Sequence, residues 1–60
     1  MDTIQIQKQA QMLFAAHGDK AELEAAQKAK KLEDEGKKDE AQSWRKVQQA
    51  INQMRGPHAS

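Results

Sequence analysis

This 60-residue chain has two histidines and a run of three acidic residues, which are candidates for metal binding or proton transfer. Histidines and carboxylates bind metal ions or transfer protons only when several of them meet in one site. His17 and His58 stand far apart in the sequence, and no carboxylate cluster lies at metal-ligand spacing from either of them. We therefore expect no metal site, and we expect His17 to cap the last carbonyl groups of a helix.

The acidic run comprises Glu33, Asp34 and Glu35. Neighbouring carboxylates act as acid and base only in a cleft that shifts their pKa values, and so short a chain has little room for a cleft. The sequence contains no phosphate-binding loop, dinucleotide fingerprint or nucleophile elbow, and it has no cysteine. The sequence thus predicts no catalytic residue, no cofactor and no enzyme activity.

Five cations towards the C-terminal end could form a basic patch on the last helix. The members of this set are Lys37, Lys38, Arg45, Lys46 and Arg55. Asp39 and Glu40 stand beside them, aromatic residues do not alternate with them, and the net charge of the chain is only +1. Proteins that bind nucleic acid usually carry a stronger basic bias. A nucleic-acid partner is therefore the alternative hypothesis and is less favoured than a protein partner.

Glycine and proline divide the chain into three segments of good helix formers. Gly18, Gly36 and the pair Gly56-Pro57 each follow such a segment, where glycine is the favoured left-handed cap. The spacing predicts helices over about 3–17, from residue 19 to before Gly36, and from 38 or 39 to 55. The expected fold is all-α, a small three-helix bundle with antiparallel neighbours, in one domain over 1–55 with a flexible tail at 56–60. A helical hairpin that dimerises is the alternative.

Apolar residues recur every three or four positions in each segment and so share one helical face. The expected core or interface residues are Leu13, Phe14, Leu32, Trp44, Val47 and Ile51, and Leu23 is also placed inside. The second segment carries an alanine stripe that would let another helix approach closely. Three local interactions are predicted as well: an N-cap at Asp2 or Thr3, a capping box of Asp19 with Glu22, and a pair of Glu24 with Lys28.

The chain has few large apolar residues for its length, so a second copy or a protein partner would help to bury them. We expect such a partner, or a homodimer, on the alanine-rich second helix or on the flank formed by Ile4, Ile6 and Met12. No segment resembles a signal peptide or a membrane span, which predicts no membrane partner. The absence of cysteine indicates a cytoplasmic protein. The leading hypothesis is a small cytoplasmic helical module that contacts a protein or serves a structural role.

The corner His17-Gly18-Asp19, followed by Ala21, and a last helix that bears Trp44 form a recognisable pattern. With Gly36, Ala41, Val47 and Ile51, these residues resemble a group of small bacterial helical proteins known as a domain of unknown function. The resemblance covers about residues 10–54. The group usually has aspartate directly after the second glycine, whereas this chain has Lys37-Lys38 before Asp39. The resemblance implies a compact helical domain and no known activity.

Overall fold

The computed structural model describes residues 2–56, which form three α-helices joined by short turns. The helices are α1 (Thr3–His17), α2 (Lys20–Asp34) and α3 (Lys38–Met54). The described part of the chain contains no strand. The prediction of an all-α, three-helix fold is thus confirmed. The part of the predicted tail at 57–60, including His58, lies outside the described residues.

Local hydrogen bonds set the ends of the helices. Asp2 is the N-cap of α1, and its Oδ1 accepts a hydrogen bond from the backbone N–H of Gln5 at 2.9 Å. At the end of α2, the N–H of Gly36 donates to the carbonyl of Glu33 and the N–H of Lys37 donates to that of Leu32. This is a Schellman cap, and it requires the left-handed φ of +80° that Gly36 adopts.

The predicted capping box at the start of α2 is wrong. Asp19 precedes α2, but its side chain makes no capping hydrogen bond, and its backbone is already helical with φ −62° and ψ −23°. An N-cap side chain reaches the first N–H groups of a helix from an extended backbone, so this conformation turns the Asp19 carboxylate away from them. Glu22, the other expected member, is hydrogen bonded to α3 instead.

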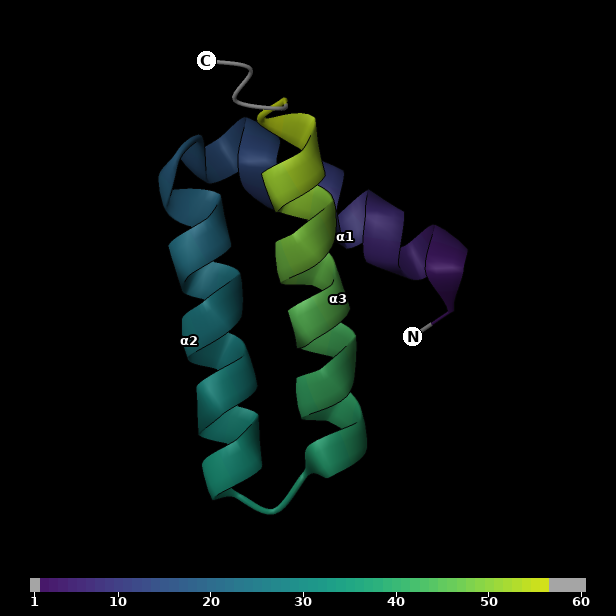
Figure 1. Cartoon of the computed structure of the whole chain (residues 1–60), viewed down its shortest axis with the longest axis vertical. Coiled ribbons are helices and arrows are strands. Elements are labelled where there is room, and N and C mark those ends of the chain that lie inside the picture. Colours follow the sequence, from purple (N-terminus) through teal and green to yellow (C-terminus); the bar gives the residue numbers. More distant parts are fainter. Residues whose placement is uncertain (1, 57–60) are drawn as a thin grey trace.

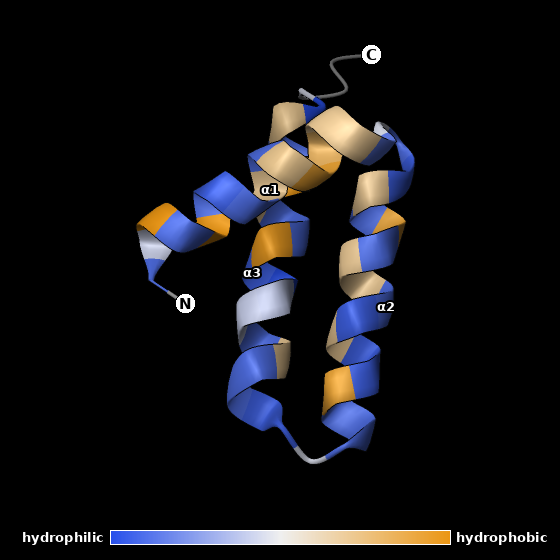
Figure 2. Ribbon diagram, turned by 180° about the vertical axis from the view of Figure 1, so that it is seen from behind, coloured by the Kyte–Doolittle hydropathy of each residue, from blue (hydrophilic) through white to orange (hydrophobic). Residues whose placement is uncertain are grey.

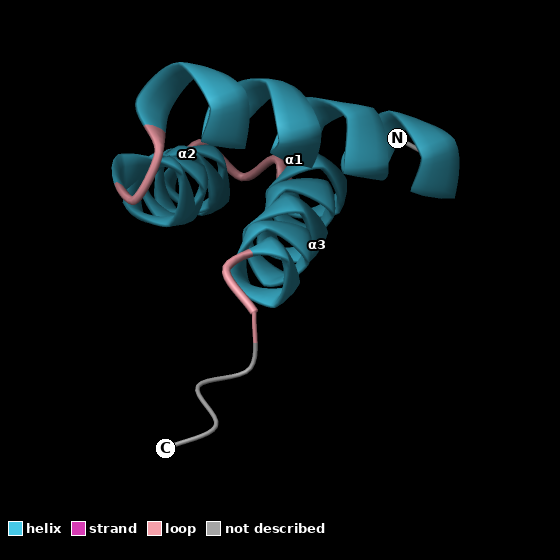
Figure 3. Cartoon of the chain, turned by 90° about the horizontal axis from the view of Figure 1, so that it is seen from above, coloured by secondary structure: helices cyan, strands magenta, loops and turns pink. Residues whose placement is uncertain are grey.

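Helices α2 and α3 form an antiparallel hairpin, and α1 crosses its open end (Figures 1 and 3). The short turn between α2 and α3 thus gives the expected antiparallel pair, whereas α1 crosses both helices and does not run alongside them. Gly18 makes this sharp change of direction with φ +59° and ψ −129°, and its carbonyl accepts the N–H of Ala21 at 3.0 Å. The N-terminal half of α1 projects past α3 (Figures 1 and 3).

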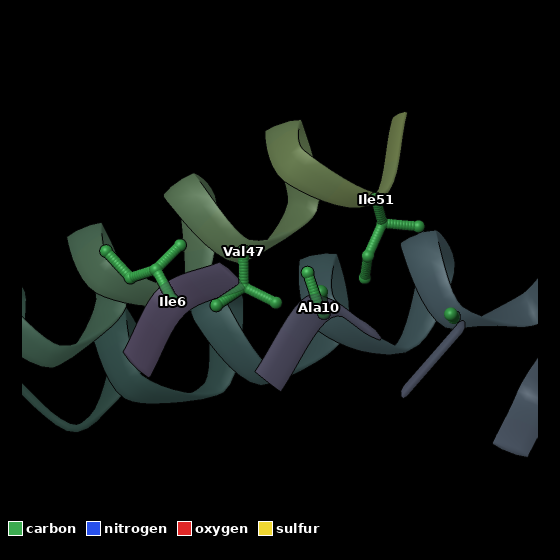
Figure 4. Packing of buried hydrophobic residues seen from close by; sticks show 6 residues of the cluster. Ile6, Ala10, Val47 and Ile51 are labelled. Atoms are coloured by element: carbon green, nitrogen blue, oxygen red, sulfur yellow. The ribbon is translucent and has the colours of Figure 1, made fainter. Parts of the chain in front are cut away.

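Alanine lies at the centre of the core. We call Ala21, Ala25 and Ala29 of α2, with Ala41 of α3, the alanine seam; none of them is more than 1% exposed. Such short side chains allow two helices to approach closely. Across the open end of the hairpin, Ile6 and Ala10 of α1 cluster with the larger apolar residues of α3 (Figure 4). Ala21 and Ala25 belong to the same cluster, so small and larger side chains together join the three helices.

The larger apolar residues divide into buried and peripheral ones. Val47 and Ile51 are fully buried and Leu32 is 8% exposed. Leu13, Phe14 and Trp44 are half-buried and pack against the edge of the core. Leu23, which the sequence placed inside, is 59% exposed, so that prediction is wrong. Leu23 lies two positions from both Ala21 and Ala25, and a shift of two positions turns its side chain to the opposite side of the helix from the seam.

Candidate functional site

The outward face of α1 carries exposed apolar side chains. We call Ile4, Lys8, Met12 and Ala15 the outer stripe, because their spacing of four, four and three places them along one side of the helix. Ile4 is 74% and Met12 is 64% exposed. Figure 2 shows hydrophobic bands within the otherwise hydrophilic N-terminal half of α1. Contiguous apolar patches mark interaction surfaces, and here Ile4 and Met12 are two exposed apolar side chains on one face about two helical turns apart.

The expected interaction flank of Ile4, Ile6 and Met12 is divided by the structure. Ile6 points into the core and is only 8% exposed, because two positions along a helix rotate a side chain to the far side. The alanine stripe of α2, the other surface expected to meet a partner, is used inside the chain. Its members pack within the molecule as part of the alanine seam.

A second surface lies where α1 leaves the face of the hairpin uncovered. It is a shallow hollow, which we call the Trp44 hollow, lined by Leu13, Glu24, Gln27, Lys28, Lys31 and Trp44. Lys28 Nζ lies 5.9 Å from the centroid of the indole ring, within the range of a cation–π contact. The expected pair of Lys28 with Glu24 is not formed, and Lys28 rests over the ring instead. The hollow thus combines an aromatic floor with a basic rim.

His17 links the end of α1 to α2. Its Nδ1 lies 3.0 Å from Oε2 of Glu24, an oxygen that is shielded from water and accepts no hydrogen bond from another described group. His17 was expected to cap the last carbonyl groups of α1, and among these the carbonyl of Phe14 accepts the N–H of Gly18. Among residues 2–56, no three histidine or acidic side chains gather at a distance suited to a metal ion. The contact therefore positions α1 against α2.

The five cations of the expected basic patch do not form one surface. Arg45 lies 3.1 Å from Glu33, Lys37 lies 3.6 Å from Glu35, and Arg55 lies 2.6 Å from Glu22. Lys38 shares a shallow hollow with Arg45 and Glu33, and Lys46 is exposed. Arg55 follows the last turn of α3, whereas Lys37 and Lys38 are at its start. Carboxylates thus pair with three of the cations, and two residues of the acidic run, Glu33 and Glu35, take part in these ion pairs.

A polar network that the residue pattern did not indicate joins the start of α2 to the end of α3. Asn52 Nδ2 donates to Oε2 of Glu22 at 3.0 Å, and Arg55 Nη1 donates to Oε1 at 2.6 Å. The hydrogen bond from Asn52, followed by that from Arg55 and its positive charge, lowers the pKa of Glu22 below its ordinary value, although desolvation opposes the shift. The sequence signal was faint: Asn52 and Arg55 share one side of a helix through their spacing of three.

No family model, curated protein or solved structure shows a significant match to the chain. The resemblance to small bacterial helical proteins therefore stays a prediction. Within the described residues, none of the helices combines the length and the apolar content that crossing a bilayer would need. The candidate sites are thus the outer stripe and the Trp44 hollow.

Proposed function

We propose that this chain is a small helical protein-interaction module that docks the outer stripe of α1 against a protein partner. One observation carries the proposal: Ile4 and Met12 stay 74% and 64% exposed in a chain that has few large apolar residues. Neutral glutamines at positions 5, 7, 9 and 11 stand between the members of the stripe, so a partner could cover this face and desolvate only one charge, that of Lys8. The N-terminal half of α1, which bears Ile4, projects past α3 (Figure 3).

The size of the stripe indicates how strong the contact is. Burial of Ile4 and Met12 contributes at most about 3–6 kcal/mol, before the entropic cost of association. A dissociation constant of about 1 μM corresponds to roughly 8 kcal/mol of binding free energy. The stripe alone therefore supports a weak contact, and a stable complex requires a second contact surface on the same partner.

Site-specific photo-crosslinking in cells tests this proposal. We expect a benzoylphenylalanine at position 4 to give discrete protein adducts, whereas the same residue at position 46, an exposed site on α3, gives none. Met12→Gln should reduce the adducts formed from position 4. The mass of the adduct shows whether the partner is a second copy of the chain or another protein. Equal labelling from positions 4 and 46, or no adduct from either, would contradict the proposal.

A cytoplasmic location and a non-catalytic role complete the proposal. The absence of cysteine supports the location, because small domains outside the cytoplasm usually rely on disulfides. Fractionation of cells that express a tagged chain tests it, and recovery outside the cytoplasm would contradict it. The shallow, open form of the hollows lined by the titratable residues supports a role in binding. The nucleic-acid alternative has less support, because carboxylates face Arg45, Lys37 and Arg55.

A further inference from the structure

We propose that the Trp44 hollow receives an acidic helical segment of the partner, with an apolar side chain on the indole and carboxylates on Lys28 and Lys31. This inference rests on the proposed function, because it assigns the second contact that a stable complex of the module requires. It also names a chemistry for the partner: a segment in which an apolar anchor stands beside acidic residues.

The floor of the hollow is held in place by the core. Leu13 and Trp44 are both half-buried and pack against the buried cluster, so their inner sides are fixed, while the flexible side chain of Lys28 is the group that lies over the ring. The crossing of α1 at the open end of the hairpin leaves this part of the α2–α3 face uncovered (Figure 1). A half-buried aromatic ring of fixed position is the kind of anchor that contributes most to protein interfaces.

The rim carries two lysines, Lys28 and Lys31. Lys28 and Lys31 stand three positions apart on α2, so they project from one side of the helix about 4.5 Å apart along its axis. None of the ion pairs among residues 2–56 includes either of them. Glu24, the carboxylate on the same rim, faces His17. Two carboxylates at helical spacing of three or four on a partner would therefore match the two lysines.

A continuous flank of α1 joins the hollow to the outer stripe. Leu13 lines the Trp44 hollow, while Gln9, one turn earlier on the same side of α1, lines a shallow depression together with Met12. A single partner could therefore contact Met12 and Trp44 at once. Linked contacts of this kind raise the affinity of a complex above that of either contact alone.

The charge and the ring content of the hollow favour a peptide over a nucleic acid. Single-stranded nucleic acid binds along a track of cations with several rings on which successive bases stack. The hollow offers only one ring and two lysines, which is too short for such a track. A carboxylate pair needs only the two lysines.

Selection from a random peptide library displayed on phage tests the inference. The intact chain is the bait, and Lys28→Glu/Lys31→Glu is the matched counter-bait. Lys30→Glu/Lys46→Glu, which reverses the same number of charges at exposed sites outside the hollow, is the control. Circular dichroism first establishes that both variants fold. Because Trp44 is the only tryptophan, its fluorescence reports directly on binding at the hollow.

We expect the selected peptides to combine acidic residues with an apolar anchor and to change the emission of Trp44. Their affinity should fall about tenfold or more for Lys28→Glu/Lys31→Glu and less than twofold for the control, as expected for loss of two charge-assisted contacts. Failure to select peptides, peptides without acidic residues, or equal loss of binding in both variants would overturn the inference. A change of Trp44 emission with oligothymidylate that depends on Lys28 and Lys31, without peptide binding, would overturn it in favour of nucleic acid.

The two proposals can fail separately. Crosslinked adducts from position 4, combined with an empty selection at the hollow, would leave the interaction module standing and remove the acidic segment. Peptides that bind the hollow, without adducts from position 4, would retain the acidic segment and remove the outer stripe as a contact.

Discussion

Enlarging one residue of the alanine seam should destabilise the chain even though the new residue is more apolar. Ala25 is fully buried within the cluster that joins all three helices. Ala25→Leu would add three carbon atoms where no space is open to solvent, so α2 must move away from its neighbours. Overpacking of this kind costs about 1–3 kcal/mol.

This loss of stability is a large share of the free energy of unfolding of so small a protein. A chain of 60 residues has a free energy of unfolding of about 3–9 kcal/mol, from roughly 0.05–0.15 kcal/mol per residue. A loss of about 1–3 kcal/mol raises the unfolding equilibrium constant roughly 5- to 150-fold. We expect the urea midpoint of Ala25→Leu to fall in proportion, with Trp44 fluorescence and circular dichroism giving the same transition.

Ala26→Leu is the matched control, because it introduces the same residue one position along the same helix. Ala26 is only half-buried and adjoins a shallow hollow beside the exposed Leu23. The change in helix propensity is the same for both variants, so the difference between them isolates the packing of the seam. We expect Ala26→Leu to stay within about 0.5 kcal/mol of the parent. An Ala25→Leu variant as stable as the parent, or an Ala26→Leu variant equally destabilised, would refute the reasoning.

Three further perturbations test other parts of the structure. Ile51→Ala should lower the free energy of unfolding in urea by about 2–5 kcal/mol, because it opens a cavity at a fully buried site. Ile4→Ala should lower it by less than about 0.5 kcal/mol. Equal losses in the two variants would contradict the assigned burial. The lowered pKa of Glu22 stabilises the fold fully above its unfolded pKa of about 4.3, and this stabilisation is lost as the pH falls through the lower folded pKa. Glu22→Gln should therefore be less stable than the parent at neutral pH and show a smaller loss of stability on acidification than an Asp34→Asn control; parallel pH curves for all three proteins would exclude this linkage. Gly18→Ala should lower the thermal midpoint, since φ +59° with ψ −129° is strained by roughly 1–3 kcal/mol for an L-residue, although a Cβ there meets no neighbour within 4 Å; an unchanged midpoint would show that the turn does not need glycine.

The bounds of the helices could be predicted because local signals determine them. Asp2 caps α1 through a backbone group three residues away, and Gly36 closes α2 through its own left-handed backbone. The alanine stripe of α2 also follows from spacing alone. Signals of this kind act within one turn of a helix, so a single sequence contains them in full.

The path of α1 and the long-range polar contacts could not be predicted in this way. The backbone angles of Gly18 decide whether α1 runs along the hairpin or crosses it, and many angles suit a glycine. The predicted capping box is absent, and Glu22 instead accepts hydrogen bonds from Asn52 and Arg55, which lie 30 and 33 residues away in the sequence. Contacts over such separations form only once the helices have packed.

The candidate surfaces were predicted in part. The spacing of Ile4 and Met12 pointed to a partner-facing flank, yet only the structure separated Ile6, which is buried, from the exposed outer stripe. The Trp44 hollow exists because α1 covers one end of the hairpin and leaves the rest uncovered (Figure 1). The residue pattern did not specify the arrangement of helices that places Lys28 and Lys31 beside Trp44.

The position of α1 across the hairpin is the claim on which both surfaces depend, and nuclear Overhauser contacts between methyl groups measure it most directly. Our account predicts contacts from Ile6 and Ala10 to Val47 and Ile51, at the open end of the hairpin (Figure 4). If Ile6 instead contacts Leu32, near the closed end of the hairpin, then α1 lies alongside α2 and α3. In that case α1 would cover the hollow over Trp44, and the account would be contradicted.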